Sequence, residues 1–277
     1  MNVKQAYDAC ERVIAKNSRS FHKTFALLPS DKRKAVWAVY TFCRTADDIV
    51  DEGHAPHEEL PRFRQEFRAF LAGDFDRTNA MWVALDDVFQ RYDMDEEPFL
   101  LQLEGQEMDL VKHRYETMDE LLEYCFHVAS TVGLMLLPIL APGKKEKLVD
   151  GAVALGYGMQ LTNILRDIGH DLSIGRIYLP ADLMAKHSVT EASLRCRVVD
   201  DSFIALWEEL AGMAESYYKE SFKTISHYPL SSRVPVEGSG LVYREILSAI
   251  RKKHYDVFER KHFVPDASKQ AILSALI

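Results

Sequence analysis

The sequence is short of the residues that break helices and of the positive charge that nucleic-acid binding requires. Its 277 residues include 13 glycines and 10 prolines, which favours long helices over many short strands and turns. The formal net charge is −8, whereas a polyphosphate partner needs a surplus of lysine and arginine, so we expect no nucleic-acid ligand. A small phosphorylated ligand stays compatible with this charge, provided that metal ions compensate for it.

Other chemical devices are also missing. The four cysteines form no CxxC pair and no Cys/His cluster, which indicates buried free thiols in a reducing cytoplasm. There is no GxGxxG nucleotide loop, so no NADPH is expected. The first residues carry no apolar core of a signal peptide, and the most apolar run, 128–142, is too short to span a bilayer and contains Pro138. We therefore expect a cytoplasmic protein in which that run is a buried core helix.

Apolar residues recur at helical spacing through most of the chain, and no stretch shows the sustained alternation of a strand. This pattern predicts an all-α fold with one domain over residues 1–277. Ser30 is expected to cap the second helix, and Thr117 with Glu120 matches a capping box. The predicted helices span residues 2–15, 31–51, 58–71, 79–92, 98–111, 121–140, 144–171, 181–186, 191–196, 202–227 and 240–261.

One of these helices carries oxygen-bearing side chains on a face that is otherwise apolar. Asn163, Asp167 and Asp171 fall at i, i+4 and i+8, so they line one side of a helix. Carboxylates are rarely buried without a partner, and carboxylate and amide oxygens suit a hard cation such as Mg²⁺. A solvated polar stripe on a surface helix is the competing interpretation.

A second acidic group closes the predicted helix 31–51. Asp47 and Asp51 share a face, and Asp48 and Glu52 lie beside them. Acids are unfavourable at a helix C-terminus, which carries partial negative charge, and a bound cation would remove the penalty. A frayed, solvated helix end would explain the same residues.

Together, the two acidic faces predict the mouth of a cavity in a helical bundle. Mg²⁺ prefers one or two carboxylates plus waters and substrate phosphates, so the expected ligand is a diphosphate. Arg44 and Arg166 could contact phosphate oxygens or simply pair with the adjacent aspartates. Glycines cost about 1 kcal/mol in a helix interior relative to alanine, so the small residues of the central helices indicate room for a long apolar group. A diphosphate with a hydrocarbon tail is an isoprenoid diphosphate. The small residues are Ala129, Ser130, Gly133, Gly156 and Gly158.

The chain resembles the squalene/phytoene synthase family, and most closely the bacterial dehydrosqualene (4,4'-diapophytoene) synthases. The segments that carry the resemblance run in family order from about residue 7 to 262. Tyr124 also matches. The segments are 18–21 (SRSF), 28–40 (LPSDKRKAVWAVY), 43–51 (CRTADDIVD), 107–110 (EMDL), 129–133 (ASTVG), 160–167 (QLTNILRD) and 175–180 (GRIYLP).

The resemblance implies a fold, a helical isoprenoid-synthase bundle around a central hydrophobic cavity, and a set of site residues. Two or three Mg²⁺ ions would be held with diphosphate by Asp47, Asp51, Asn163, Asp167 and Asp171. Tyr243 would act with the aspartates at the reacting end. Arg176, Tyr178 and Arg260 are weaker candidates for the polar rim. The remaining residues implied to bind substrate are Asn17, Ser18, Arg19, Ser20, Phe21, Tyr40, Arg44, Asp48, Tyr124, Val128, Val132, Gly133, Gln160 and Arg166.

The resemblance also implies a reaction, the Mg²⁺-dependent head-to-head condensation of two farnesyl diphosphates through a cyclopropylcarbinyl diphosphate to dehydrosqualene. The alternatives are phytoene from two geranylgeranyl diphosphates, squalene with NADPH, a terpene cyclase or chain-elongating prenyltransferase, and a non-catalytic helical scaffold. Peripheral membrane contact is expected because the hydrocarbon parts of substrate and product are apolar. No obligate protein partner is evident. Two departures, His170 for a frequent acid and Asn17 for a frequent His, concern the charge around the ligands and its pH dependence.

Overall fold

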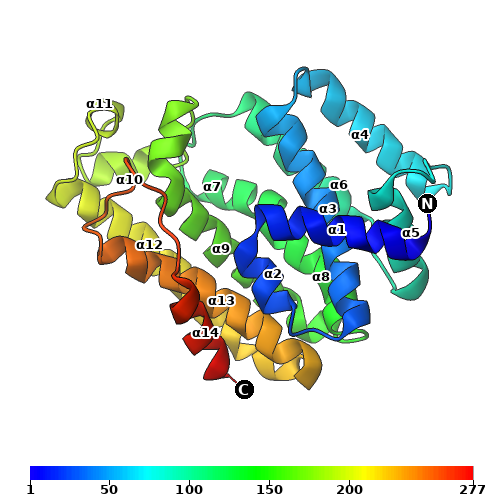
Figure 1. Cartoon of the computed structure of the whole chain (residues 1–277). Helices are drawn as coiled ribbons and strands as arrows, with labels where there is room; N and C mark the ends of the chain where they lie inside the picture. Colours follow the sequence, from blue (N-terminus) through cyan, green and yellow to red (C-terminus); the bar gives the residue numbers. More distant parts are fainter. Residues whose placement is uncertain (277) are drawn as a thin grey trace.

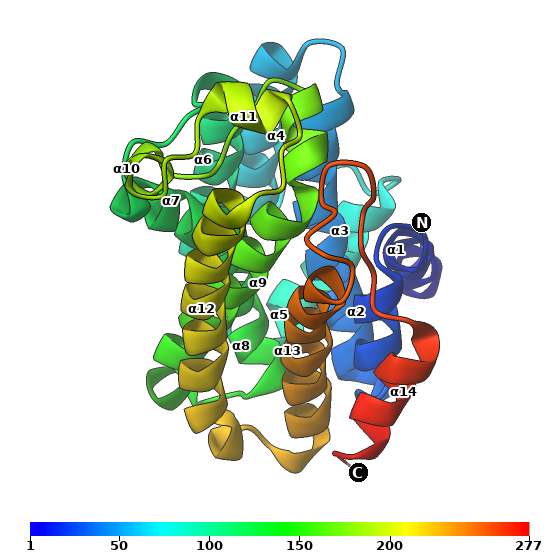
Figure 2. The same cartoon turned by 90° about the vertical axis from the view of Figure 1, so that its left-hand side faces the viewer.

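Helix α9 (Lys145–Ser173) runs through the middle of the molecule and carries the Asn163–Asp171 face. In the computed structural model, which describes residues 1–276, α9 packs against α12, α13, α8 and the short segment η1 (Figure 1). Its neighbours come from both halves of the chain, so α9 joins them. Turning the molecule shows α12, α9 and α13 side by side, with α14 packed on α13 near the C-terminus (Figure 2).

The predicted all-α class is confirmed. Within residues 1–276, the only β-type pairing is an isolated bridge between Arg114 and Ile177. The other elements are α1 (Val3–Asn17), α2 (Arg19–Phe25), α3 (Ser30–Glu52), α4 (Pro56–Leu71), α5 (Ala80–Arg91), α6 (Glu97–Val111), α7 (Met118–Cys125), the π-helical η1 (Phe126–Ser130), α8 (Thr131–Leu140), α10 (Ala181–Lys186), α11 (Glu191–Arg195), α12 (Asp201–Lys223), the 3-10 turn η2 (Ile225–His227), α13 (Leu230–Arg251) and α14 (Asp266–Ser274).

Two predicted helix ends are wrong. The helix predicted at 240–261 is α13, which begins at Leu230 and ends at Arg251. Gly238 and Gly240 lie inside it because helices pack closely there: a Cβ on Gly240 would come within 2.9 Å of the Phe222 ring, and one on Gly238 would collide with Leu273. The chain then leaves the helix through left-handed residues His254 (φ 54°) and Tyr255 (φ 58°). Short helices α2 and α14 were not predicted.

The predicted helix 121–140 is interrupted by η1, which adds a π-helical turn between α7 and α8. The run Met118–Leu140 is long and apolar enough to cross a membrane, a test that the core helices of soluble proteins also pass. Here it packs against α6, α9 and α3. The sequence interpretation of a core segment therefore suits its contacts.

Capping differs in detail from the predictions. Ser30 is the first residue of α3 rather than its cap, and the capping residue Pro29 offers no side-chain acceptor. Thr117 caps α7 as predicted, since its hydroxyl accepts from the Glu120 N–H at 3.3 Å. The reciprocal bond is shifted by one residue, because the Glu120 carboxylate accepts from the Glu116 N–H at 3.0 Å.

The core divides into two buried clusters. The first gathers apolar residues of α1, α3, α4, α5, α6 and α8, and includes the packed rings of Phe42, Phe67 and Phe99. The second gathers residues of α7, α9, α12 and α13 around Trp207 and Tyr218. A cavity lies where the two clusters meet, since its lining belongs to both. The fold therefore places hollow space at the centre of the bundle.

Cysteine placement follows the prediction at three of four positions. Cys10, Cys43 and Cys125 are buried free thiols, whereas Cys196 is exposed. The difference arises because Cys196 ends the short helix α11 at the surface.

Candidate active site

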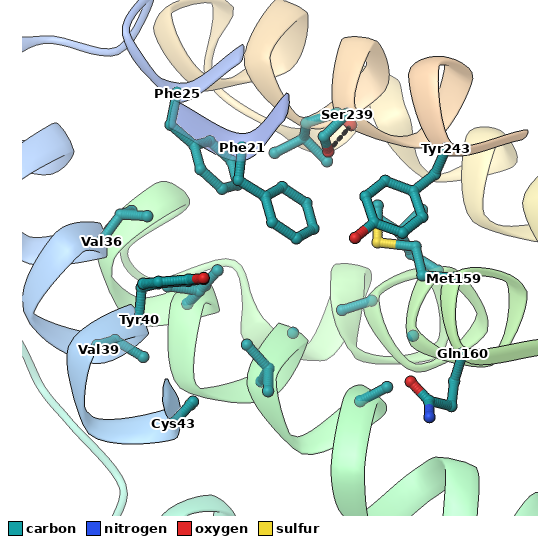
Figure 3. A pocket seen from close by; sticks show the side chains of 18 of the residues that line it. Phe21, Phe25, Val36, Val39, Tyr40, Cys43, Met159, Gln160, Ser239 and Tyr243 are labelled. Atoms are coloured by element: carbon teal, nitrogen blue, oxygen red, sulfur yellow. Dashed lines mark hydrogen bonds between the residues drawn. The ribbon is translucent and has the colours of Figure 1, made fainter. Parts of the chain in front are cut away.

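A cavity of about 260 Å³ lies between α3, η1–α8, α9 and α13, with α2 covering one side. On α3, α9 and α13 the residues that line the cavity recur mostly at spacings of three and four, so each of these helices presents one face to it. On α9 this face runs from Ala152 to Asn163, about 16 Å of helix at 1.5 Å per residue. Figure 3 shows Phe21, Tyr40 and Tyr243 pointing into this space from three different helices. The lining is mostly apolar, so the cavity suits a hydrocarbon.

Nine of the predicted site residues line this one cavity. They supply the aromatic, amide and acidic groups of its polar end and the small and branched groups of its wall. Phe21 stacks on Tyr243 with ring centroids 5.1 Å apart. The nine residues are Phe21, Tyr40, Asp47, Val128, Val132, Gly133, Gln160, Asn163 and Tyr243.

Asp47 brings the first acidic group to the cavity. Its Oδ1 accepts a hydrogen bond from Gln106 Nε2 at 2.6 Å. Burial raises the pKa of Asp47 to about 7, and the negative charges of Asp51 and Asp109 add to this although Arg44 opposes it. A carboxylate held in such surroundings is unfavourable unless a cation joins it.

The second acidic group lies on the last turns of α9. Arg166 donates two hydrogen bonds to Asp167, at 2.9 and 2.6 Å, and Lys261 Nζ lies 3.1 Å from the same carboxylate. Burial by itself would raise the pKa of Asp167. The hydrogen bonds and positive charges of Arg166 and Lys261 outweigh this effect, so the pKa of Asp167 lies below its ordinary value. Burial, with repulsion from Asp167, raises the pKa of Asp171 to about 8.

An arginine and a buried aspartate link the two groups. Arg176 Nη1 donates to Asp51 at 3.1 Å, and its Nη2 donates to the backbone oxygen of Asp109 at 3.3 Å. The Asp109 carboxylate accepts from Tyr124 at 2.8 Å and from Tyr178 at 2.7 Å. Its charge acts on both Asp47 and Asp171. Asp109 therefore connects the two acidic helices.

Sequence reasoning missed Asp109 as a functional residue and ranked Arg176 and Tyr178 only as weak candidates. Asp109 stands in the matching EMDL segment, and an acid within the apolar run of α6 was the available signal. Lys261 and Gln106 were also missed, because their partners lie 94 and 59 positions away in the chain. No local pattern marks such contacts.

The other predicted residues do not line the cavity. Arg44 pairs with Asp48 and, at 3.7 Å, with Glu52, which realises the simple ion-pair alternative. Tyr124 is buried against Asp109. Ser18 caps α2, accepting from the Phe21 N–H at 3.4 Å. Asn17, Arg19, Asp51, His170 and Arg260 are exposed, and Ser20 is half-buried. The side chains of Arg166 and Asp167 are mostly buried, and burial also dominates the environment of Asp171.

The donor set fits Mg²⁺ held together with a diphosphate. Carboxylate and amide oxygens are its preferred protein ligands, and Asn163 Oδ1 is enclosed with no hydrogen-bond partner. Among residues 1–276, no three His, Cys, Asp or Glu side chains converge into a closed metal site. An open arrangement of protein ligands is expected where phosphate oxygens and waters complete the coordination of Mg²⁺.

Comparison with known proteins decides the family. A family model described as squalene/phytoene synthase matches residues 14–268. The chain belongs to the squalene/phytoene synthase family. It is 35% identical to the 15-cis-phytoene synthase of Synechococcus elongatus, over 95% of this chain and 90% of that protein. It is 37% identical to a chloroplastic phytoene synthase 2 of Solanum lycopersicum, over 96% of this chain and 87% of that one.

Among solved structures, the chain is similar to a dehydrosqualene synthase crystallised with a ligand. The two share 38% sequence identity and superpose with a TM-score of 0.94, covering 99% of this chain and 96% of the other. The resemblance drawn from the sequence motifs is confirmed. The protein is a prenyltransferase of isoprenoid biosynthesis that joins prenyl diphosphates head to head, in a family that is typically Mg²⁺-dependent.

Proposed function

We propose that this protein is a dehydrosqualene synthase. It would join two farnesyl diphosphates through a cyclopropylcarbinyl diphosphate (presqualene diphosphate) to dehydrosqualene for C30 carotenoid biosynthesis, with Mg²⁺ and without NADPH. The observation that carries the proposal is the apolar cavity lined by Asp47 of α3 and by Gln160 and Asn163 of α9, in a chain that superposes on a dehydrosqualene synthase.

The diphosphate groups would lie between the two acidic faces. Asp47 and Asp51 on α3, with Asn163, Asp167 and Asp171 on α9, would hold Mg²⁺. When bound, Mg²⁺ neutralises negative charge that builds on a leaving diphosphate. The guanidinium group of Arg44 lies beside Asp48 and that of Arg166 beside Asp167, and both would then be free to reach phosphate oxygens.

The hydrocarbon chains would lie in the cavity, where the lining excludes water from the reacting carbons. The rings of Phe21, Tyr40 and Tyr243 face the same space, and aromatic faces attract cations. Burial raises the pKa values of Tyr40 and Tyr243, so both phenols keep their protons and can donate hydrogen bonds. The double bond of one substrate captures the allylic cation of the other. Loss of a proton to the released diphosphate would give the cyclopropylcarbinyl diphosphate. Loss of its own diphosphate, ring opening and loss of a second proton to diphosphate would then give dehydrosqualene.

A second candidate is phytoene synthesis from two geranylgeranyl diphosphates. The observation in its favour is that the matched curated relatives from Synechococcus elongatus and Solanum lycopersicum are phytoene synthases at 35% and 37% identity. Squalene synthesis with NADPH is a third outcome. The depth of the cavity available to the tails separates the first two.

The test is product analysis with purified protein and Mg²⁺. Farnesyl and geranylgeranyl diphosphate are supplied separately, each with and without NADPH. We expect dehydrosqualene from farnesyl diphosphate without NADPH. Phytoene as the dominant product, or squalene only with NADPH, would overturn the proposal, and incorporation of isopentenyl diphosphate would indicate chain elongation instead.

We further propose a cytoplasmic location with peripheral contact at the inner membrane face, because the hydrocarbon product dissolves in lipid rather than in water. Fractionation of cells that make the protein tests this. If all the protein were found in the membrane fraction and only detergent released it, a peripheral attachment would be contradicted.

A further inference from the structure

The π-helical segment η1 supplies two residues of the cavity wall, Val128 and Ala129. Insertions of this kind within α-helices are rare and occur frequently at functional sites. The N–H of Thr131 bonds back to the Phe126 carbonyl, which closes the wide turn. The shape of η1 therefore fixes how far the Val128 side chain projects toward the substrate.

Glycines allow two helices to press against η1. On the α9 side, a Cβ on Gly156 would come within 2.6 Å of Ser130 N. On the α6 side, a Cβ on Gly105 would lie 2.8 Å from Val128 Cγ1, 2.9 Å from His127 Cβ and 3.0 Å from the His127 carbonyl carbon. Real Cβ atoms essentially never approach so closely, so any side chain at 105 must displace η1 or α6.

Gly105 is buried on α6 and does not itself line the cavity. Val128 does both, since it lies against Gly105 and belongs to the cavity wall. Residue 105 therefore reaches the cavity through Val128 of η1, which it contacts.

Several side-chain contacts hold α6 in place near Gly105. Next to Gly105, Gln106 donates to Asp47 at 2.6 Å, and Glu107 lies 3.2 Å from Arg64 of α4. One turn further on, Asp109 accepts from Tyr124 and Tyr178. On the other side of η1, Ser130 Oγ donates to the Val153 carbonyl at 2.8 Å. Free volume lies on the cavity side, so added bulk at 105 is expected to push Val128 toward the substrate.

We propose that Gly105 is a positioning residue that sets the width of the hydrocarbon cavity by letting η1 lie against α6. The inference rests on the proposed function, because it assumes that a farnesyl chain occupies this cavity. Gln102, one turn away on α6, lines the cavity, as does Asp47, the partner of Gln106. The constriction would therefore lie near the polar end, where two chains must fit side by side.

The test measures equilibrium binding of two probes in the presence of Mg²⁺. One is farnesyl thiodiphosphate, in which sulfur replaces the ester oxygen so that the bond resists ionisation, and the other is inorganic pyrophosphate. Overpacking of this size typically costs enough free energy to raise a Kd about tenfold or more. We therefore expect Gly105→Ala to weaken binding of the farnesyl probe at least about tenfold. Pyrophosphate binding should stay within about twofold, because the acidic groups do not move.

Adding Val128→Ala to Gly105→Ala should restore most of the lost farnesyl binding, since it removes the methyl nearest to the new Cβ. Gly212→Ala is the matched control, because a Cβ there meets nothing within 4 Å. Should Gly105→Ala not fold, Val128→Leu adds bulk at the same point and is expected to give the same selective loss.

Unchanged binding of the farnesyl probe by Gly105→Ala would overturn the inference, as would an equal loss of pyrophosphate binding. Failure of the added Val128→Ala substitution to restore farnesyl binding would also overturn it. Unimpaired farnesyl binding by Val128→Leu would do the same. Failure of the wild-type protein to bind the farnesyl probe would instead count against the proposed function, so the two failures are distinguishable.

Discussion

At the scale of single residues, Asp47 and Asp171 show that the site lowers the stability of the fold when no cation is present. Burial and neighbouring carboxylates raise their pKa values to about 7 and about 8, against an ordinary value of 3.8. A group that is harder to ionise in the folded protein than in the unfolded chain destabilises the fold wherever it must ionise. The acids are therefore retained for a purpose other than stability, and cation binding is the purpose that the donor set supports.

The first prediction concerns the metal-free protein between pH 4 and pH 8. Folded Asp47 keeps its proton up to about pH 7, whereas the unfolded chain loses it near pH 3.8. The folded state thus binds more protons in this window, so its stability falls as pH rises. Asp47→Asn, which cannot ionise, should raise the free energy of unfolding at pH 8 by up to about 4 kcal/mol and have little effect near pH 4.

Urea unfolding in a chelating buffer at several pH values measures this. Asp8→Asn, at an exposed position on α1, serves as the control and should leave the pH profile unchanged. An Asp47→Asn profile parallel to that of the wild type would show that the raised pKa is absent.

The second prediction concerns Asp109. Asp109→Asn removes the charge that faces Arg176 and leaves one tyrosine hydroxyl opposite an N–H₂ group instead of an acceptor. Breaking a buried network in this way costs about 1–3 kcal/mol. We expect a lower melting temperature together with reduced turnover, because the Asp109 charge no longer acts on Asp47, Asp171 and Arg176.

The neighbouring Glu107→Gln is the matched control for Asp109→Asn. It removes a partly exposed ion pair with Arg64, so its effect on stability should stay below about 1 kcal/mol. Equal effects of the two substitutions would contradict the role given to Asp109.

At the scale of secondary-structure elements, helical periodicity predicted the long helices, because their apolar faces repeat in the sequence. It failed where tertiary contacts decide the structure. Gly238 and Gly240 resemble a helix break, yet they are the contact surface of α13 with α14 and α12. The π-helical turn of η1 changes the spacing by one residue within an apolar run, which leaves no signal in its composition.

The third prediction concerns the loop after α13, which crosses α9 at Gly169. The Gly169 N–H donates to the Val257 carbonyl at 3.2 Å, and a Cβ at 169 would lie 2.5 Å from the Phe258 oxygen. Gly169→Ala should lift the loop, lower stability by about 1–3 kcal/mol and take Lys261 away from Asp167. Pyrophosphate binding should weaken as a result.

Calorimetry with Mg²⁺ and pyrophosphate checks both effects. Lys261→Met removes the charge without displacing the loop, so it should weaken pyrophosphate binding and leave the unfolding temperature almost unchanged. Gly212→Ala, with open space for its methyl, should match or exceed wild-type stability. Wild-type behaviour of Gly169→Ala would show that the loop is not held by this close approach.

At the scale of the whole molecule, the two buried clusters meet around a cavity to which α3 and α9 bring their acidic ends. The sequence predicted this convergence because both helices carry oxygen ligands on otherwise apolar faces. It ranked Arg176 only as a weaker candidate for the rim and did not predict Asp109 or Lys261. Their partners are distant in the chain, so only the folded arrangement brings them together.

The most direct test of the account is prenyl coupling by Asp47→Ala and Asp167→Ala, each assayed with farnesyl diphosphate at ordinary Mg²⁺ concentration. Circular dichroism and thermal unfolding first establish that both variants are folded, and Asp8→Ala controls for loss of an exposed aspartate. Since each substitution removes a proposed Mg²⁺ ligand from one acidic face, we predict that product formation falls by about a hundredfold or more in both. Near-normal product formation by either well-folded variant would contradict the claim that the two faces act together.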